Sequence, residues 1–137
     1  MKKKLISIPS VYERVSEACF SLRDFCFRNN VEKNICSELE LCLTEALNNV
    51  IKHAYKEDAD QKIDLTYIFN ANELEIIIED SGLPRTNFKE PVLNYDPSDV
   101  NTLPEGGMGL FIIKNLMNMV NYNRIDGKNT FYMKKIL

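Results

Sequence analysis

Residues 44–55 read TEALNNVIKHAY, and this stretch decides how the rest of the chain is interpreted. Its apolar residues continue a stripe with helical spacing that starts further back, which predicts a helix from about residue 32 or 37 to residue 55. Glu45, Asn49 and His53 are spaced four residues apart, so on a helix they stack along one side. That side lies next to the apolar stripe and therefore at the edge of a core.

This polar side carries residue types that suit phosphate chemistry. The amide oxygen of Asn49 is a ligand type that Mg²⁺ accepts beside substrate phosphates. The carboxylate of Glu45, one turn earlier, can orient or deprotonate a hydroxyl group. Taken alone, the same pattern is also typical of an ordinary polar helix face with a single histidine.

Asp80-Ser81-Gly82 follows a strongly apolar segment predicted to be a strand over residues 73–80. A carboxylate at the end of a strand can accept a hydrogen bond from an exocyclic amine such as that of adenine. Gly82 would let the backbone approach a flat base closely. A plain Asp-x-Gly turn is the alternative, because such turns are common.

Gly106, Gly107 and Gly109 lie where a loop leads into a predicted helix over residues 108–119. Glycines at such a junction expose backbone N–H groups, and the helix dipole adds positive potential, so phosphates bind well there. A simple hinge is the alternative. The chain contains neither a P-loop pattern nor the motif set of protein kinases.

The remaining elements predict a two-layer α/β (α+β) sandwich in one domain, residues 1–137, with a mixed, mostly antiparallel sheet covered on one face by three helices. A strand is predicted at 3–8, and Ser10 and Glu13 form a capping-box pattern for a helix that ends near Asn30. Residues 62–69 and 73–80 alternate as a hairpin, as do 120–125 and 129–136 around Asp126-Gly127.

Four of the five prolines fall between residues 83 and 107, where no periodicity is visible. Compact domains rarely contain a structureless connection longer than about 12–15 residues unless it is functional or disordered. We therefore predict a mobile lid over residues 83–107.

Composition limits the classes of function. The net charge is −3 over 137 residues, which gives no electrostatic basis for binding nucleic acid or an anionic membrane. No apolar run reaches transmembrane length. The four cysteines form no CxxC pair and His53 is the only histidine, so zinc motifs lack their ligands. We expect core cysteines in a reducing, cytoplasmic protein.

The three polar elements are more specific together than singly. Glu-x-x-x-Asn-x-x-x-His on a helix, Asp-x-Gly after a strand, a long loop, and Gly-x-Gly opening a helix resemble the GHKL (Bergerat-fold) ATP-binding family. More narrowly, the chain resembles the small bacterial anti-sigma-factor serine kinases. The matching segments are 44–55, 79–84, 106–116 and 122–130, and the resemblance covers nearly the whole chain.

The resemblance implies binding of ATP with Mg²⁺. In it, Asn49 would coordinate Mg²⁺ and Glu45 would be the general base that takes the proton of a substrate serine. His53 would close the helix end of the pocket, and Lys52 is one candidate for a cation near the phosphates.

The resemblance also implies how the rest of the nucleotide is held. Asp80 would read the adenine amine, with Gly82 beside the base and the hydroxyl of Thr130 in support. Backbone N–H groups at the glycine turn would hold the phosphates, namely those of Gly107, Met108, Gly109 and Leu110.

For function, the resemblance implies an anti-sigma regulatory factor that forms a homodimer, binds a sigma factor and phosphorylates an anti-anti-sigma antagonist protein. The alternative is a non-catalytic ATP/ADP-binding partner-switch module, because few cations precede the glycine turn; Lys52, Arg85 and Lys89 are the candidates. A fragment of a sensor histidine kinase is disfavoured, since His53 lies inside the nucleotide motif.

Overall fold

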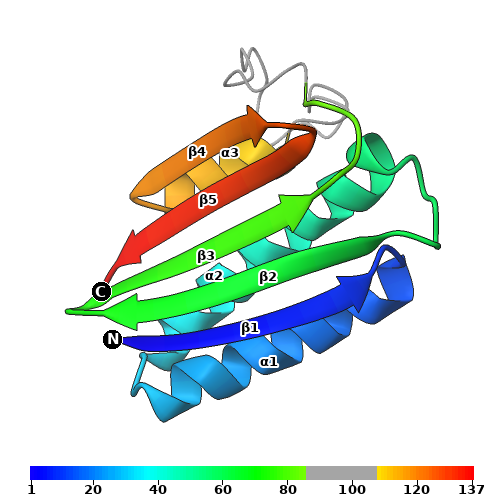
Figure 1. Ribbon diagram of the computed structural model, residues 1–137. Helices are drawn as coiled ribbons and strands as arrows, with labels where there is room; N and C mark the ends of the chain where they lie inside the picture. Colours follow the sequence, from blue (N-terminus) through cyan, green and yellow to red (C-terminus); the bar gives the residue numbers. More distant parts are fainter. Residues whose placement is uncertain (86–107) are drawn as a thin grey trace, which may run out of the picture.

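The computed structural model describes residues 1–85 and 108–137, which form a five-stranded sheet with helices packed on one face (Figure 1). The elements, in chain order, are β1 (Lys2–Pro9), η1 (Tyr12–Arg14), α1 (Val15–Arg28), α2 (Lys33–Asn49), η2 (Val50–Ala54), β2 (Lys62–Asn70), β3 (Glu73–Asp80), α3 (Met108–Leu116), β4 (Met119–Ile125) and β5 (Lys128–Ile136). The predicted two-layer α/β architecture is confirmed.

The sheet has the order β1-β2-β3-β5-β4, and every pairing among these described strands is antiparallel. Two-residue turns join β2 to β3 and β4 to β5. Ala71 and Asn72 have φ values of 48° and 66°, and Asp126 and Gly127 have φ values of 51° and 77°. Two consecutive positive φ values give the turn type that matches the natural twist of a hairpin, so the predicted turns are confirmed.

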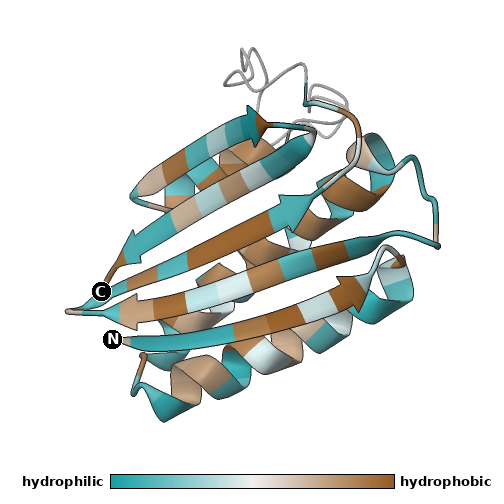
Figure 2. Ribbon diagram, in the orientation of Figure 1, coloured by the Kyte–Doolittle hydropathy of each residue, from teal (hydrophilic) through white to brown (hydrophobic). Residues whose placement is uncertain are grey.

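The core lies between the sheet and the helices. Alternate side chains of β2 and β3 point toward the helices and are fully buried, and the apolar stripes of α1 and α2 pack against them. Figure 2 shows the resulting apolar bands along the central strands. The hydroxyl of Tyr67 in β2 donates a hydrogen bond to the carbonyl oxygen of Ala18 in α1 at 2.8 Å, which ties the two layers together.

The predicted capping box at Ser10 is wrong. The backbone N–H of Ser10 donates to the carbonyl oxygen of Gln61, so this residue extends the pairing of β1 with β2 instead of capping a helix. Its hydroxyl is buried and has no hydrogen-bond partner among the described residues. The chain becomes helical at Tyr12, in the short 3₁₀ segment η1, and α1 begins at Val15.

The helix that contains the polar stripe begins near the earlier of its two predicted starts and changes form at its end. After Asn49 the chain continues as η2, one turn of π-helix, in which the N–H of Tyr55 donates to the carbonyl oxygen of Val50 at 3.0 Å. Single π turns in helices are rare and occur frequently at functional sites.

The third helix, predicted to end at Met119, ends at Leu116. The N–H of Asn118 already donates to the carbonyl oxygen of Lys134 in β5, so strand pairing begins where the helix was expected to continue. Most of the predicted lid at 83–107, together with Gly106 and Gly107, lies outside the described residues. None of the described helices combines the length and apolar character needed to cross a bilayer.

Two leucines of α2 provide a test of this packing. Leu43 is fully buried, whereas Leu41 is 45% exposed on the same helix. We expect Leu43→Ala to lower the free energy of unfolding by about 2–5 kcal/mol, because it leaves a cavity in the core. Leu41→Ala should change it by about 0.5 kcal/mol or less. Urea denaturation followed by circular dichroism measures both, and equal losses would contradict the burial of Leu43.

Candidate functional site

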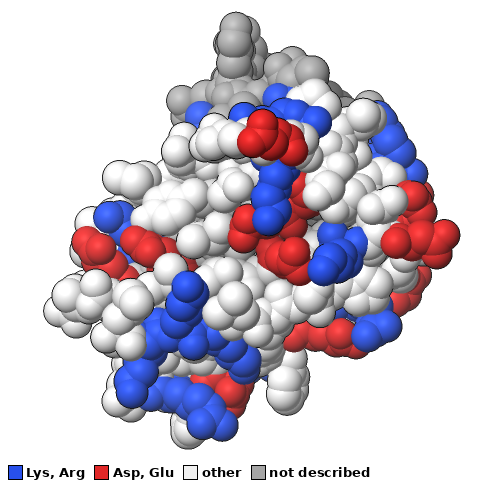
Figure 3. Space-filling model, viewed as in Figure 1, with Lys and Arg blue, Asp and Glu red and all other residues white. Residues whose placement is uncertain are grey.

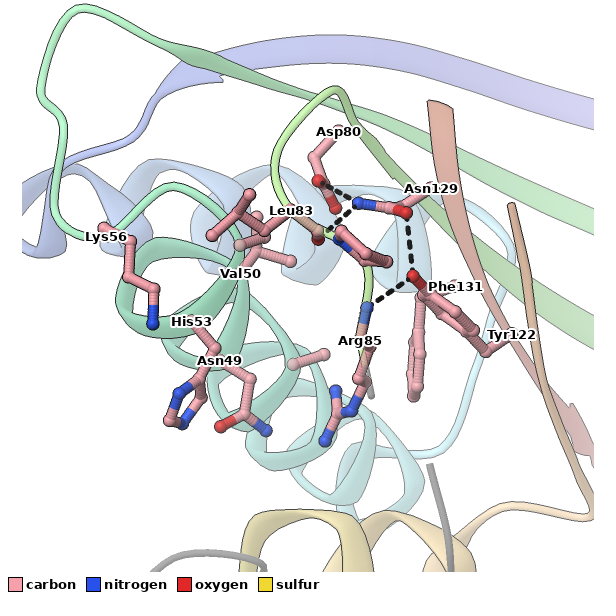
Figure 4. A pocket seen from close by; sticks show the side chains of 13 residues that line it. Asn49, Val50, His53, Lys56, Asp80, Leu83, Arg85, Tyr122, Asn129 and Phe131 are labelled. Atoms are coloured by element: carbon pink, nitrogen blue, oxygen red, sulfur yellow. Dashed lines mark hydrogen bonds between the residues drawn. The ribbon is translucent and has the colours of Figure 1, made fainter. Parts of the chain in front are cut away.

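A cavity of about 400 Å³ opens at the end of the helical layer (Figure 4). Its walls come from three parts of the chain: the end of α2 with η2, the end of β3 with residues 83–85, and the inward side chains of β4 and β5. This volume falls within the range of typical small-molecule sites. The predicted polar elements on α2 and at the end of β3 therefore meet at one cavity.

Asp80 ends β3 and is only 6% exposed. Its Oδ1 accepts hydrogen bonds from Nδ2 of Asn129 at 2.8 Å and from the N–H of Gly82 at 2.9 Å. Burial raises the pKa of Asp80, and these two hydrogen bonds act in the opposite direction. Within the described part of the chain no residue donates to Oδ2, so this oxygen remains an open acceptor at the cavity wall.

Gly82 is held against the end of η2. A Cβ atom at this position would lie 2.4 Å from the carbonyl oxygen of Ala54, which is closer than any side chain allows. The same oxygen accepts a hydrogen bond from the N–H of Leu83 at 2.8 Å. The glycine is thus required for close approach to the backbone at the end of η2, and its predicted role beside a base stays a prediction.

Thr130, predicted to support the base, lies on the opposite face of the sheet. It lines a shallow hollow with Asn123 and Tyr132 on the side that carries no helices. The pairing of β3 with β5 instead sets Asn129 opposite Asp80. Side chains alternate along a strand, so only one of two neighbouring residues can face the cavity.

Asn129 was missed by the sequence analysis, although it is only 2% exposed and fully hydrogen-bonded. Its Nδ2 donates to Asp80 and to the carbonyl oxygen of Leu83 at 3.0 Å. Its Oδ1 accepts from the hydroxyl of Tyr122 and from Nη1 of Arg124, each at 2.7 Å. A signal was available: Asn129 is in phase with the buried Phe131 of β5, so it points inward.

Tyr122 extends this network toward the segment after β3. Its hydroxyl also accepts a hydrogen bond from the N–H of Arg85 at 2.8 Å. The guanidinium carbon of Arg85 lies 5.9 Å from the centre of the Phe131 ring, an arrangement in which the ring face attracts the cation. Burial lowers the pKa of Arg85. One of the three predicted candidate cations therefore lines the cavity, and Lys89 lies outside the described residues.

Glu45 and Asn49 meet the start of α3. A Cβ atom added to Gly109 would lie 2.7 Å from Oε2 of Glu45 and 3.5 Å from Nδ2 of Asn49. Glycine is thus the residue that lets the first turn of α3 approach this side of α2. Leu110, next along α3, is buried in the core and anchors that turn.

The π turn sets which residues after Asn49 face the cavity. His53 remains in the cavity wall, but Lys52 is exposed and lies outside the lining, whereas Lys56 is part of it. Partial burial, together with the positive charges of Lys52, Arg85 and Lys56, lowers the pKa of His53. These effects favour the neutral form of the imidazole.

The donor set fits a nucleotide better than a metal held by the protein alone. No cluster of three or more His, Cys, Asp or Glu side chains that could hold a metal ion occurs within residues 1–85 and 108–137. Asn49 offers one amide oxygen, which suits an ion that takes its other ligands from phosphates and water. Asp80 offers an open acceptor, and Arg85 and Lys56 supply positive charge at the cavity wall.

Comparison with known proteins agrees with this geometry. Residues 8–135 match the family described as histidine kinase-like ATPase domain. A serine-protein kinase RsbW of Bacillus thuringiensis is 30% identical over 134 residues, which cover 96% of this chain and 83% of the relative. The RsbW of Listeria monocytogenes is 29% identical over 98% of this chain and 87% of the relative.

Solved structures show the same fold at low identity. The RsbU and RsbW domains of a Mycobacterium tuberculosis protein match with a TM-score of 0.70 and 12% identity, over 98% of this chain and 32% of that one. The SiaB-SiaC complex of Pseudomonas aeruginosa matches with a TM-score of 0.65 and 12% identity, over 98% of this chain and 89% of that one. The chain therefore belongs to the histidine kinase-like ATPase domain family, with the serine-protein kinases RsbW among its relatives.

Proposed function

We propose that this chain is an anti-sigma regulatory factor with ATP-dependent serine kinase activity toward an anti-anti-sigma antagonist protein. The observation that carries the proposal is the meeting of Glu45, Asn49 and the start of α3 beside the cavity that contains Asp80. A base, a magnesium ligand and a phosphate-binding helix start are the parts that phosphoryl transfer from ATP requires. The relatives named serine-protein kinase support the same activity.

Asp80 recognises adenine in this proposal. Oδ1 is already occupied by Asn129 and Gly82, so the exocyclic amine of the base donates to the open Oδ2. The two hydrogen bonds at Oδ1 offset part of the desolvation cost of the buried carboxylate, and a third hydrogen bond from the amine offsets more of it.

The phosphates bind at the start of α3. The backbone N–H groups proposed to hold them are those of Gly107, Met108, Gly109 and Leu110, where the helix dipole attracts negative charge. Asn49 would hold Mg²⁺ through its amide oxygen, and the ion would offset the charge of the phosphates. Arg85 and Lys56, both in the cavity wall, offset charge that develops during transfer.

Glu45 is the general base. It takes the proton of the substrate serine hydroxyl as the serine oxygen bonds to the terminal phosphorus of ATP, and the bond from that phosphorus to ADP breaks. The close contact with Gly109 keeps the carboxylate next to the phosphate-binding turn. The non-catalytic partner-switch module keeps the same binding residues but makes no use of Glu45 as a base.

We further propose that residues 1–137 act as one domain in the cytoplasm, as a homodimer that also binds a sigma factor. All four cysteines are free thiols, which accords with a reducing compartment. The SiaB-SiaC structure, a complex of a protein with this fold, supports a protein partner.

The role of Asp80 is tested by Asp80→Asn. Asparagine can keep both hydrogen bonds at Oδ1 but places a donor where the adenine amine needs an acceptor. We expect ATP affinity to fall by about 10–100-fold, the value of one hydrogen bond to a charged group. Isothermal titration with ATP and GTP measures the loss and the selectivity. Asp64→Asn, on the helix-free face, is the control, and equal ATP affinity in both variants would contradict the assignment.

The same variant has a stability signature. Burial raises the pKa of Asp80 in the folded state, so the folded protein binds the proton of this carboxyl more tightly than the unfolded chain does. The contribution of Asp80 to the free energy of unfolding is therefore favourable at low pH and is lost as pH rises through the folded-state pKa. Asp80→Asn should therefore keep or raise the thermal stability of the nucleotide-free protein at pH 7. Below about pH 3, well under the ordinary aspartate pKa, the carboxyl is protonated in both the folded and the unfolded protein, and any gain should vanish.

Asn49→Ala tests the magnesium ligand. We expect it to remove most of the increase in ATP affinity that Mg²⁺ gives, roughly tenfold or more, and to change Mg²⁺-free binding little. Titrations with and without Mg²⁺ separate the two effects. Asn48→Ala, one residue earlier on α2 and outside the cavity lining, should behave like the wild type. A magnesium response that survives in Asn49→Ala would exclude Asn49 as the ligand.

Glu45→Gln separates the kinase from the binding module. Transfer from radiolabelled ATP to the cognate antagonist, isolated from the native cell by pull-down, should fall by about 10²–10⁴-fold, while ATP affinity stays near the wild-type value. Glu38→Gln, on the same helix and paired with Lys135, is the control. If the wild type binds ATP and transfers nothing, the non-catalytic module is the correct function.

A further inference from the structure

The described lining of the cavity contains two Lys or Arg side chains, those of Arg85 and Lys56. On the face of the sheet seen in Figure 3, Lys and Arg side chains gather over β1, at the opposite edge of the sheet from β4. Among the described residues, the positive charge available to a triphosphate in the cavity thus comes from Arg85, Lys56 and the start of α3. Their exact placement matters, because charge stabilisation depends on geometry.

The hairpin of β4 and β5 holds Arg85 at two points. The N–H of Arg85 donates a hydrogen bond to the hydroxyl of Tyr122 at 2.8 Å. Tyr122 is paired with Phe131 across the two strands, and the guanidinium carbon of Arg85 lies 5.9 Å from the centre of the Phe131 ring. Two neighbouring aromatic residues therefore fix Arg85, one through its backbone and the other through its side chain.

The side chain of Arg85 points away from Asp80. Figure 4 shows it extending from the segment after β3 toward the side of the cavity where Asn49 lies. Asn49 in turn lies beside Gly109 at the start of α3, the part of the site proposed to bind phosphates. A guanidinium group presents several N–H donors in one plane, which matches the oxygens of a phosphate group. The cation therefore lies at the phosphate end of the cavity, and Asp80 lies at the adenine end.

The hydroxyl of Tyr122 connects the two ends. It accepts the hydrogen bond from the N–H of Arg85 and donates one to Oδ1 of Asn129 at 2.7 Å. Nδ2 of Asn129 donates in turn to Oδ1 of Asp80 at 2.8 Å. Tyr122 and Asn129 each donate and accept, so the hydrogen bonds strengthen one another and a change at one end affects the other.

We propose that Tyr122 is a positioning residue for Arg85. Its hydroxyl holds the backbone of Arg85 where the guanidinium reaches the phosphates of a bound nucleotide, and it ties this cation to Asp80 through Asn129. Binding of the base and binding of the phosphates are thereby coupled. The inference rests on the proposed nucleotide site and deepens it, because it separates Arg85 from Lys56, which follows η2 and takes no part in these hydrogen bonds.

Arg85→Gln tests the cation. We expect it to lower ATP affinity by about tenfold and AMP affinity by about twofold or less, because AMP carries a single phosphate. Isothermal titration in the presence of Mg²⁺ measures both dissociation constants. Equal losses of affinity for ATP and AMP would contradict the assignment of Arg85 to the phosphates.

Tyr122→Phe tests the positioning role, because it removes only the hydroxyl. Oδ1 of Asn129 keeps its hydrogen bond from Arg124, so the variant should fold, which circular dichroism checks. We expect the ratio of ATP affinity to AMP affinity to fall by about five- to tenfold, nearly as much as in Arg85→Gln. Once the hydroxyl is absent, Arg85→Gln should lower ATP affinity further by only about twofold or less. Lys56→Gln should lower ATP affinity by the same factor with and without the hydroxyl.

Tyr132→Phe is the matched control. The hydroxyl of Tyr132 donates to Glu75 at 2.7 Å on the helix-free face, so its loss should leave both affinities at the wild-type value. If the losses from Tyr122→Phe and Arg85→Gln multiply in the double variant, the positioning role is overturned and the nucleotide site stands. A wild-type protein that binds neither ATP nor AMP would overturn the proposed function itself.

Discussion

The hydrogen bond between Asp80 and Asn129 is the contact on which the site depends. It joins β3 to β5, at two positions whose residue numbers differ by 49, where the sheet meets the cavity. Burial raises the pKa of this carboxyl group, and the hydrogen bonds from Asn129 and from the N–H of Gly82 act in the opposite direction, because they favour the ionised form. The same two bonds fix the carboxylate so that only Oδ2 remains for a ligand.

The network around this bond gives the cavity its rigidity. Tyr122 and Arg124 of β4 hold the oxygen of Asn129, and the backbone of Arg85 is attached to Tyr122. The edge hairpin and the segment after β3 are thereby fixed relative to Asp80. Buried polar groups that are fully paired specify one arrangement, because each alternative leaves a donor or acceptor unsatisfied.

Close backbone contacts bring the remaining parts together. The chain at Gly82 touches the end of η2, and Gly109 of α3 touches Glu45 and Asn49 of α2. A Cβ at either glycine would push these elements apart. The site is therefore built where helix ends and strand ends approach one another closely through their glycines. The functional side chains project into the site from rigid elements.

The sequence by itself determined the local structure and much of the chemistry. Some features depend only on residues that are close in the chain, so the sequence predicts them. They are the alternation along the strands, the turn at Asp126-Gly127, and the four-residue spacing of Glu45 and Asn49. Only the tertiary structure decided that Asn129, not Thr130, faces Asp80, and that the helix after Asn49 becomes a π turn. The physical reason is that the register of strands far apart in the chain, and the hydrogen-bonding pattern at a helix end, are set by the packing of the whole core.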